Sequence, residues 1–195
     1  MIYFLGGAAR SGKTAASREF LKQTGIPFFP LDLLMMGFVN GMPEMGVDSE
    51  ADERIIARQL WPVVRGMAQA LDEDRIDYLF EGAQLLPQDV EALCQAVEGR
   101  ARAVFLGYAD LDPQAKLRQI RQYGGGLDDW MRHYDDARVL EEVQRMIGQS
   151  RWLREECARL GLRYIETGVE LAETVNKAVR FLRTSGVEES ANGRE

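Results

Sequence analysis

The sequence predicts an α/β protein in which a parallel sheet is covered by helices on both faces. Short apolar segments alternate along the chain with longer segments whose apolar residues recur at helical spacing. Strands that alternate with helices in this way pair in parallel, because each helix carries the chain back to the edge where it started. The carboxyl ends of the strands therefore share one edge, and ligands of such sheets bind there.

The expected strands are short runs of β-prone apolar residues that end at glycine, proline or a polar residue. The first stops at Gly6 and Gly7. The second contains Pro27 and Pro30, which confine it to an edge or an irregular strand. The predicted strands cover residues 2–5, 26–31, 78–80, 103–106 and 164–165.

Helices are expected where apolar residues recur every three or four positions. Gly25 and Gly161 follow two such segments and suit the left-handed turn that often ends a helix. Asp48 or Ser49 is placed to cap another, because a side-chain oxygen there accepts from the first free N–H groups. The predicted helices cover residues 13–24, 49–71, 113–123, 136–160 and 171–182, with a short one after Pro87.

The length predicts one domain over residues 1–184, followed by a polar, flexible tail at 185–195. Within the domain, residues 33–48 are rich in methionine and glycine and show little periodicity, so we expect a mobile loop on the substrate side. Residues 108–136 predict a lid, because the three glycines 124–126 interrupt the helical pattern and suit a hinge.

Composition excludes several classes of function. The net charge of −7 disfavours a nucleic-acid binder, whose affinity depends on many contacts to phosphate. Two cysteines and one histidine leave little for a disulfide framework, a cysteine-ligated zinc site or a Ser-His-Asp triad. No apolar run approaches the ~20 residues of a membrane span, and the N-terminus has no signal-peptide pattern. We expect a cytoplasmic protein with no nucleic-acid or membrane partner.

The strongest motif is GAARSGKT, which fits G-x-x-x-x-G-K-[ST] and lies between a predicted strand and a predicted helix. Its glycines let successive backbone N–H groups surround a di- or triphosphate, and the helix N-terminus adds a favourable dipole. The lysine reaches the β- and γ-phosphates, and the threonine hydroxyl binds Mg²⁺. The predicted nucleotide-binding residues are Gly7, Ala8, Ala9, Arg10, Ser11, Gly12, Lys13 and Thr14.

Two carboxylates follow predicted strands and therefore lie near this loop. Asp32 follows the second strand, where it can accept the proton of an acceptor hydroxyl or orient it. The alternative for Asp32 is a turn residue that caps the segment after it. Glu81 ends the third strand, where it can hold magnesium, through a bound water, or a substrate group. The alternative for Glu81 is a solvated carboxylate at the end of a strand.

Basic residues flank the three glycines of the predicted lid. The chain has 20 arginines against 4 lysines, and Arg118, Arg121 and Arg132 lie on either side of residues 124–126. Arginine binds phosphate oxygens at two points and stays charged. A lid of this kind brings charge to the transferring phosphoryl group and excludes water. The alternative is that these arginines form a solvated face on two helices.

The order of these features resembles the small-molecule kinases of the nucleoside monophosphate kinase type. The resemblance spans residues 1–184 and rests on the phosphate loop, Asp32, the arginine-bearing lid and the final strand and helix. It implies a three-layer α/β/α P-loop NTPase fold with strand order 2-3-1-4-5 and a helical lid. It also implies ATP with Mg²⁺ as donor, a small acceptor, and contact of Asp32 and the lid arginines with that acceptor.

Weaker strings are similar to the 2-phosphoglycerate kinase-like branch of this group, namely FEGAQLLP, FLGYADLDPQAKLRQIRQY, DDW and SRWLREECARLGLRYIETG. Three features depart from the patterns. Glu81 replaces the usual aspartate, and Gln84 stands where related chains often carry histidine. No arginine lies between Arg18 and Arg54, which argues against an adenylate kinase.

The sequence as a whole predicts an ATP-dependent phosphotransferase that moves the γ-phosphate of Mg-ATP to a small metabolite, with a phosphorylated or hydroxyl-bearing acid as one candidate. The predicted catalytic residues are Lys13, Asp32, Arg118, Arg121 and Arg132, and the predicted metal ligands are Thr14 and Glu81. We expect a monomer or a homodimer. Two alternatives stay open: an ATPase switch that binds a protein partner through residues 33–47, and a toxin-like kinase of nucleotide sugars.

Overall fold

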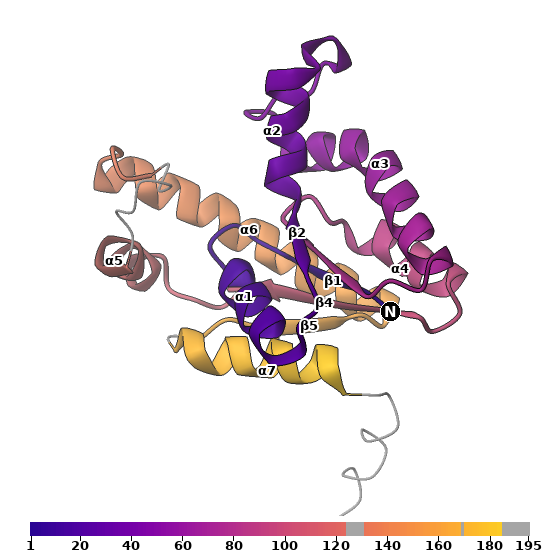
Figure 1. The fold of residues 1–195 in the computed structure, drawn as a ribbon. Helices are drawn as coiled ribbons and strands as arrows, with labels where there is room; N and C mark the ends of the chain where they lie inside the picture. The colour runs from indigo at the N-terminus through magenta and orange to yellow at the C-terminus, as the bar shows by residue number, and fades with distance from the viewer. Residues whose placement is uncertain (124–130, 169, 185–195) are drawn as a thin grey trace, which may run out of the picture.

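The computed structural model describes residues 1–123, 131–168 and 170–184, which form a five-stranded parallel sheet with helices on both faces (Figure 1). The strand order is β2-β3-β1-β4-β5, as the resemblance implied. The strands are β1 (Ile2–Gly7), β2 (Phe28–Pro30), β3 (Tyr78–Gly82), β4 (Ala101–Gly107) and β5 (Arg163–Glu166). All five predicted strands are present, with bounds that differ by at most two residues.

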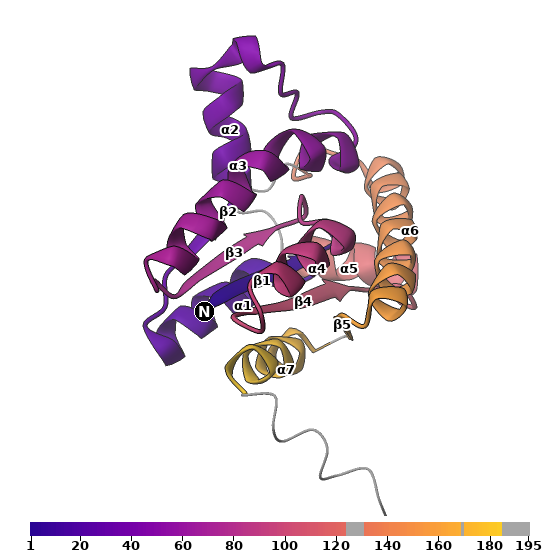
Figure 2. The ribbon, with the colours of Figure 1, turned by 90° about the vertical axis from the view of Figure 1, so that its right-hand side faces the viewer.

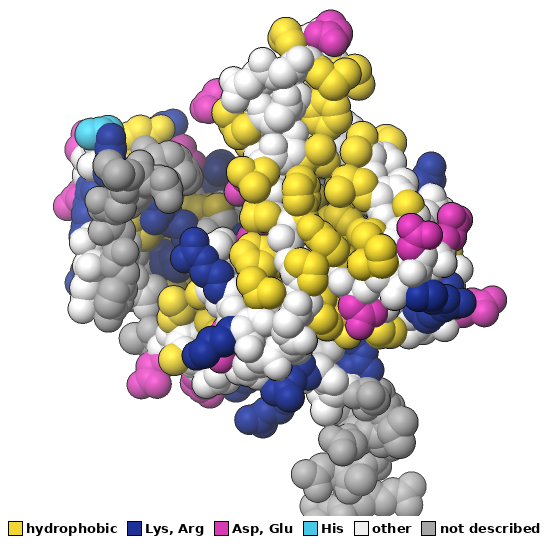
Figure 3. All heavy atoms as spheres, viewed as in Figure 1, with side chains coloured by type: hydrophobic (Ala, Val, Ile, Leu, Met, Phe, Trp, Pro, Cys, Tyr) yellow, Lys and Arg dark blue, Asp and Glu magenta, His cyan; other side chains and the backbone are white. Residues whose placement is uncertain are grey.

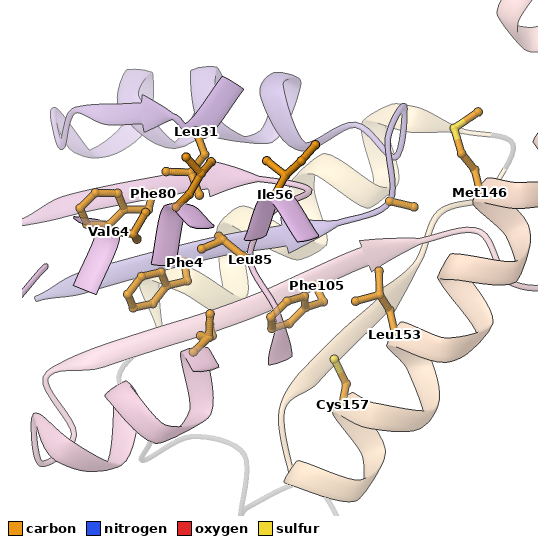
Figure 4. Close-up of a cluster of buried hydrophobic side chains, with 14 of the residues drawn as sticks. Phe4, Leu31, Ile56, Val64, Phe80, Leu85, Phe105, Met146, Leu153 and Cys157 are labelled. Atoms are coloured by element: carbon orange, nitrogen blue, oxygen red, sulfur yellow. The ribbon is translucent and has the colours of Figure 1, made fainter. Parts of the chain in front are cut away.

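The sheet alternates its side chains between two apolar cores, as strand geometry requires. On one face, α1 (Lys13–Thr24) and α7 (Leu171–Arg183) cover Tyr3 and Leu5 of β1. On the other face, α3 (Glu53–Glu73), α4 (Pro87–Ala96) and α6 (Asp136–Leu160) cover Ile2 and Phe4 (Figure 2). Figure 4 shows the second core, in which the side chains of the strands meet those of α3 and α6; among the labelled residues are Phe4, Val64, Phe80, Phe105 and Leu153.

Strand β1 lies at the centre of the sheet, and all six of its residues are buried. It pairs with β3 so that Leu5 lies beside Glu81, and with β4 so that Gly7 lies beside Leu106. The end of β1, and the loop that follows it, are therefore brought next to the carboxyl ends of β3 and β4. This register places the predicted phosphate loop beside Glu81.

The loop predicted at residues 33–48 is wrong over most of its length. The chain forms helix α2 (Leu31–Gly41) and a short 3-10 turn at Pro43–Met45. Helix α2 projects from the sheet beside α3 (Figure 1). It buries Leu31 and packs the half-buried Leu34, Met35 and Phe38 of the same face against the core. It also leaves Leu33 and Met36 exposed, so apolar residues lie on its outer face as well and hide the helical spacing. Leucine and methionine favour helix even without a periodic pattern.

The next helix begins later than the sequence suggested. Helix α3 starts at Glu53, and the Asp52 carboxylate accepts a hydrogen bond of 2.9 Å from the Arg54 N–H as its cap. Asp48, one of the predicted caps, instead accepts from the Glu50 N–H in a turn. Both carboxylates satisfy a backbone donor two residues ahead, and that local pattern does not decide which of them starts the helix.

The predicted lid includes helix α5 (Pro113–Tyr123) and ends at Asp136, the first residue of α6. Residues 124–126, the proposed hinge, lie outside the described part of the chain. Helix α5 packs against α6. Because the proposed hinge is not among the described residues, the closing motion of the predicted lid stays a prediction. Among the described residues, no helix is both long enough and apolar enough to cross a membrane.

Replacing Gly37 by alanine tests helix α2. Gly37 lies within the helix, has no positive φ, and has open space where a Cβ would stand. Alanine restricts the unfolded chain and favours helix, so we expect Gly37→Ala to raise stability by ~0.5–1 kcal/mol. Chemical denaturation measures the change. The control Gly25→Ala should lower stability, because Gly25 ends α1 with a φ of 74°. A Gly37→Ala variant no more stable than wild type would contradict the helix.

Candidate active site

The phosphate loop joins β1 to α1 in a backbone conformation that needs glycine at two positions. Gly7 has a φ of 138°, and a Cβ added there would lie 2.1 Å from the carbonyl oxygen of Leu106. Gly12 has a φ of 94° and precedes α1 without a side-chain cap. The first N–H groups of α1 are therefore available to a ligand, as the N-terminus of a helix favours an anion.

Lys13 is the first residue of α1, and its side chain folds back over the loop. Its Nζ donates a hydrogen bond of 2.8 Å to the carbonyl oxygen of Ala8, and the side chain is only 7% exposed. Burial lowers the pKa of Lys13, and the carboxylates of Glu81, Asp32 and Glu53 oppose that effect. The ammonium group thus lies in a desolvated place where a phosphate would be strongly attracted.

Thr14 and Glu81, the predicted metal ligands, lie together. The Thr14 hydroxyl donates to Glu81 Oε2 over 3.3 Å, and Glu81 is 5% exposed at the end of β3. Burial raises the pKa of Glu81, Asp32 adds to that rise, and Lys13 opposes it. A hydroxyl and a carboxylate are oxygen ligands of the kind Mg²⁺ prefers. No group of three or more acidic, cysteine or histidine side chains in the described part of the chain could hold a metal by itself.

Asp32 lies in the first turn of α2, on the same side of the sheet as the loop. Its Oδ1 accepts a hydrogen bond of 2.8 Å from Gln84 Nε2, and its charge acts on both Lys13 and Glu81. The structure therefore brings together Lys13, Thr14, Asp32 and Glu81 from three elements, α1, α2 and β3. Gln84, noted in the sequence only as a departure from a family pattern, proves to be the hydrogen-bond partner of Asp32.

The three predicted lid arginines do not line the pocket beside the loop. Arg121 donates to Asp136 and to the carbonyl oxygen of Tyr134, over 2.9 and 2.7 Å, and so ties α5 to the start of α6. Arg132 donates to Nε2 of its neighbour His133. Arg118 is exposed on α5. Contact of these arginines with transferring phosphate stays a prediction.

A pocket of about 300 Å³ opens between the loop, α5 and the start of α7. Its volume is at the lower end of the range for small-molecule sites. Polar groups of the loop form one wall and apolar side chains form another, which suits a nucleotide with charged and uncharged ends. The lining residues that matter here are Arg10, Lys13, Thr14, Lys116, Ile120 and Leu171.

Lys116 is a residue of this pocket that sequence reasoning missed. It is 5% exposed, donates to the carbonyl oxygen of Arg10 over 2.9 Å, and lies 4.1 Å from the centre of the Tyr108 ring. Burial, together with the charges of Arg10 and Lys13, lowers the pKa of Lys116 to about 8. Its one sequence signal was its type, because it is one of only 4 lysines in an arginine-rich chain.

A second cluster lies close to Lys13 and was also missed. Glu53, the first residue of α3, accepts from Gln149 and lies 3.9 Å from Arg145, both on α6. Burial raises the pKa of Glu53, while Arg145 and Lys13 oppose that rise. Arg145 also pairs with Glu142, three residues before it on α6. The cluster joins α3 to α6 on the side of the loop that faces Glu81 and Asp32.

Comparison with known proteins found likeness in structure alone. No protein-family model matches the sequence, and no curated protein matches it either. Among solved structures, a gluconokinase from Sinorhizobium meliloti 1021 aligns with a TM-score of 0.58 and 19% identity over 92% of this chain and 90% of that one. A shikimate kinase from Bacteroides thetaiotaomicron aligns with a TM-score of 0.56 and 17% identity, over 92% and 94%.

A sugar kinase from a Janibacter species aligns with a TM-score of 0.53 and 16% identity, over 93% of each chain. At identities this low, the structural alignments show that the fold is shared, and they do not show that the substrate is shared. The neighbours are small-molecule kinases of the P-loop group, and this chain has the same sheet order and surrounding helices. The chain therefore has the three-layer P-loop kinase fold.

Proposed function

We propose that this protein is an ATP-dependent kinase that transfers the γ-phosphate of Mg-ATP to a hydroxyl group of a small metabolite. One observation carries the proposal. The buried ammonium of Lys13 lies in a phosphate loop and is faced by the carboxylates of Asp32 and Glu81. A cation for the donor phosphate thus stands beside a carboxylate for the acceptor hydroxyl, on a fold that kinases share.

The donor would lie along the loop, with its phosphates on the N–H groups at the start of α1 and on Lys13. The remainder of the nucleotide would extend into the pocket between α5 and α7, against Ile120 and Leu171. Thr14 and Glu81 would hold Mg²⁺ together with phosphate oxygens and water, since Mg²⁺ keeps several such ligands. The metal supplies charge that stabilises the transferring phosphoryl group.

The acceptor would bind on the other side of the loop, where Asp32 is held by Gln84. A carboxylate there orients the acceptor hydroxyl and accepts its proton as the bond to phosphorus forms. The names of the structural neighbours, shikimate kinase and gluconokinase, support a small metabolite as acceptor. The strings FEGAQLLP and FLGYADLDPQAKLRQIRQY favour the 2-phosphoglycerate kinase-like branch and an acceptor that is a phosphorylated or hydroxyl-bearing acid.

A second candidate, an ATPase switch with a protein partner, is favoured by the exposed apolar side chains of α2 and the turn after it. Leu33 is 62% exposed, and Met36, Met42 and Met45 are also exposed. Figure 3 shows hydrophobic side chains gathered over α2 and α3. Release of ADP that depends on a small acceptor separates the kinase from the switch, which needs no such acceptor.

Lys13→Met should abolish acceptor-dependent release of ADP in a panel of hydroxyl-bearing metabolites with Mg-ATP. Loss of one preorganised cation at the phosphate predicts a fall of at least ~100-fold. Folding should be retained, because burial already disfavours the charged form of Lys13, as its lowered pKa indicates. A cooperative melting transition checks this. Lys22→Met, an exposed lysine on the same helix, is the control. Turnover by Lys13→Met close to wild type would overturn the assignment.

Asp32→Asn should slow phosphorylation of the acceptor much more than it weakens the binding of ADP. A missing general base predicts a ~100-fold or larger fall in turnover, with the dissociation constant of ADP nearly unchanged. Turnover is measured on the acceptor found in the panel, and binding by calorimetry. Asp48→Asn, in the turn before α3, is the control. Equal losses in both measurements would remove Asp32 from the acceptor side.

Glu81→Gln should reduce the effect of Mg²⁺ on nucleotide binding. Wild type is expected to bind ADP more tightly with Mg²⁺ than in EDTA, and loss of the carboxylate should shrink that difference ~10-fold or more. Titration calorimetry under both conditions measures it. Glu91→Gln should behave as wild type, because the Glu91 carboxylate on α4 accepts from Gln95 of the same helix and takes no part in the loop. A Glu81→Gln variant with the full Mg²⁺ effect would show that Glu81 serves the acceptor or the fold instead.

A further inference from the structure

Four successive carbonyl groups of the phosphate loop each accept a hydrogen bond from a side chain. The oxygen of Ala8 accepts from Lys13 Nζ at 2.8 Å, and that of Ala9 from the Tyr108 hydroxyl at 2.8 Å. The oxygen of Arg10 accepts from Lys116 Nζ at 2.9 Å, and that of Ser11 from the Thr167 hydroxyl at 3.0 Å. No carbonyl from residue 8 to residue 11 is left without such a donor.

The four donors come from separate parts of the chain. Lys13 belongs to α1, Tyr108 follows β4, Lys116 lies on α5, and Thr167 follows β5. All four are buried, and Tyr108 is fully so. The sulfur of Met146 on α6 is a second acceptor for the Tyr108 hydroxyl, at 3.1 Å, and the Thr167 N–H donates to the carbonyl oxygen of Gly107 at 2.6 Å. Three of the four donors, Tyr108, Lys116 and Thr167, thus fix the loop from outside its own sequence.

Fixing the carbonyls also fixes the amide groups. In a planar trans peptide, the C=O of one residue and the N–H of the next point in opposite directions. When the carbonyls of residues 8–11 face their donors, the N–H groups of residues 9–12 face the other way. One of these, the N–H of Ser11, closes a turn onto Ala8 at 3.3 Å. Successive backbone N–H groups that are held in this way can form a concave site that binds anions.

The loop also contains backbone strain that needs support. Arg10 has a φ of 57°, which residues with a side chain rarely adopt. Such residues persist where the surrounding structure over-determines them. The bond from Lys116 to the carbonyl oxygen of Arg10 provides this support at the strained residue itself.

We propose that Tyr108, Lys116 and Thr167 are positioning residues that hold the loop in its phosphate-binding form before any ligand arrives. This rests on the proposed function only in taking the ligand to be a nucleotide phosphate, and it requires no particular acceptor. Tyr108 gives the sharpest test of the three residues. Its hydroxyl is buried and reaches a ligand only through its hydrogen bond to the loop.

Lys116 should make the affinity of the loop for phosphate depend on pH. The charged groups that face it are Arg10 from the loop and Lys13 from α1, and the ring of Tyr108 lies over its ammonium. Its pKa is lowered to about 8, so its charge is lost from the free protein as the pH rises past that value. A bound phosphate favours the charged form, so binding takes up a proton. The affinity for phosphate should therefore fall above pH 8, by up to ~10-fold per pH unit for one linked proton.

The test measures binding of inorganic tripolyphosphate, and of ADP in EDTA, by titration calorimetry at pH 7 and pH 9. Tyr108→Phe, Thr167→Val and Lys116→Met should each weaken binding at pH 7 five-fold or more while the melting transition stays cooperative. Thr167→Ser keeps the hydroxyl and should bind as wild type does. Thr184→Val is the matched control, because its hydroxyl also donates to a backbone carbonyl but lies away from the loop, at the end of α7.

Lys116→Arg keeps its charge across this pH range, so it should lose less affinity between pH 7 and pH 9 than wild type does. If Tyr108→Phe fails to fold, the pair Thr167→Val and Thr167→Ser decides the matter. Folded variants that bind as wild type does would overturn the proposal, as would equal losses in Thr167→Val and Thr167→Ser. Failure of wild type to bind either probe would overturn the proposed function as well, whereas tight binding by all variants would overturn this inference alone.

Discussion

The close approach of β1 to β4 at Gly7 is the constraint on which the site depends. The backbone of Gly7 lies so near the Leu106 carbonyl that a single added carbon would stand 2.1 Å from it. Because the chain leaves the sheet at this point, the loop runs within reach of Tyr108 and Thr167, which follow β4 and β5. A larger residue would push the loop off β4, and α1 with Lys13 would move with it.

The charges around Lys13 explain how a lysine is kept buried in the middle of the site. Burial works against its ammonium, while Glu81, Asp32 and Glu53 stabilise it from three different elements. Burial also raises the pKa of Glu81 and Glu53, so the lysine and these carboxylates depend on one another. The carboxylates hold the cation in place, and their excess negative charge suits a metal ion that would enter with the nucleotide.

The sheet, the loop and two of the site carboxylates were predictable from local patterns. The apolar run that forms β1 and the motif after it are contiguous, so they need no tertiary information. Helix α2 was missed because exposed apolar residues such as Leu33 and Met36 lie on its outer face. They hide the helical spacing of the apolar residues that it packs against the core, on which helix prediction relies. The lid arginines were grouped by their nearness to three glycines, yet Arg121 is held by Asp136 and Tyr134. Sequence distance to a hinge does not say where a side chain points.

The sequence by itself determined the fold class, the strand order by resemblance, and the phosphate loop with Lys13 and Thr14, because each is encoded in neighbouring residues. Only the tertiary structure brought Tyr108 and Lys116 to the loop, across 99 and 106 positions of the chain. It also joined Gln84 to Asp32 and Glu53 to α6. Such contacts depend on how the strand order and helix packing fold distant segments together, and no local pattern of residues records them.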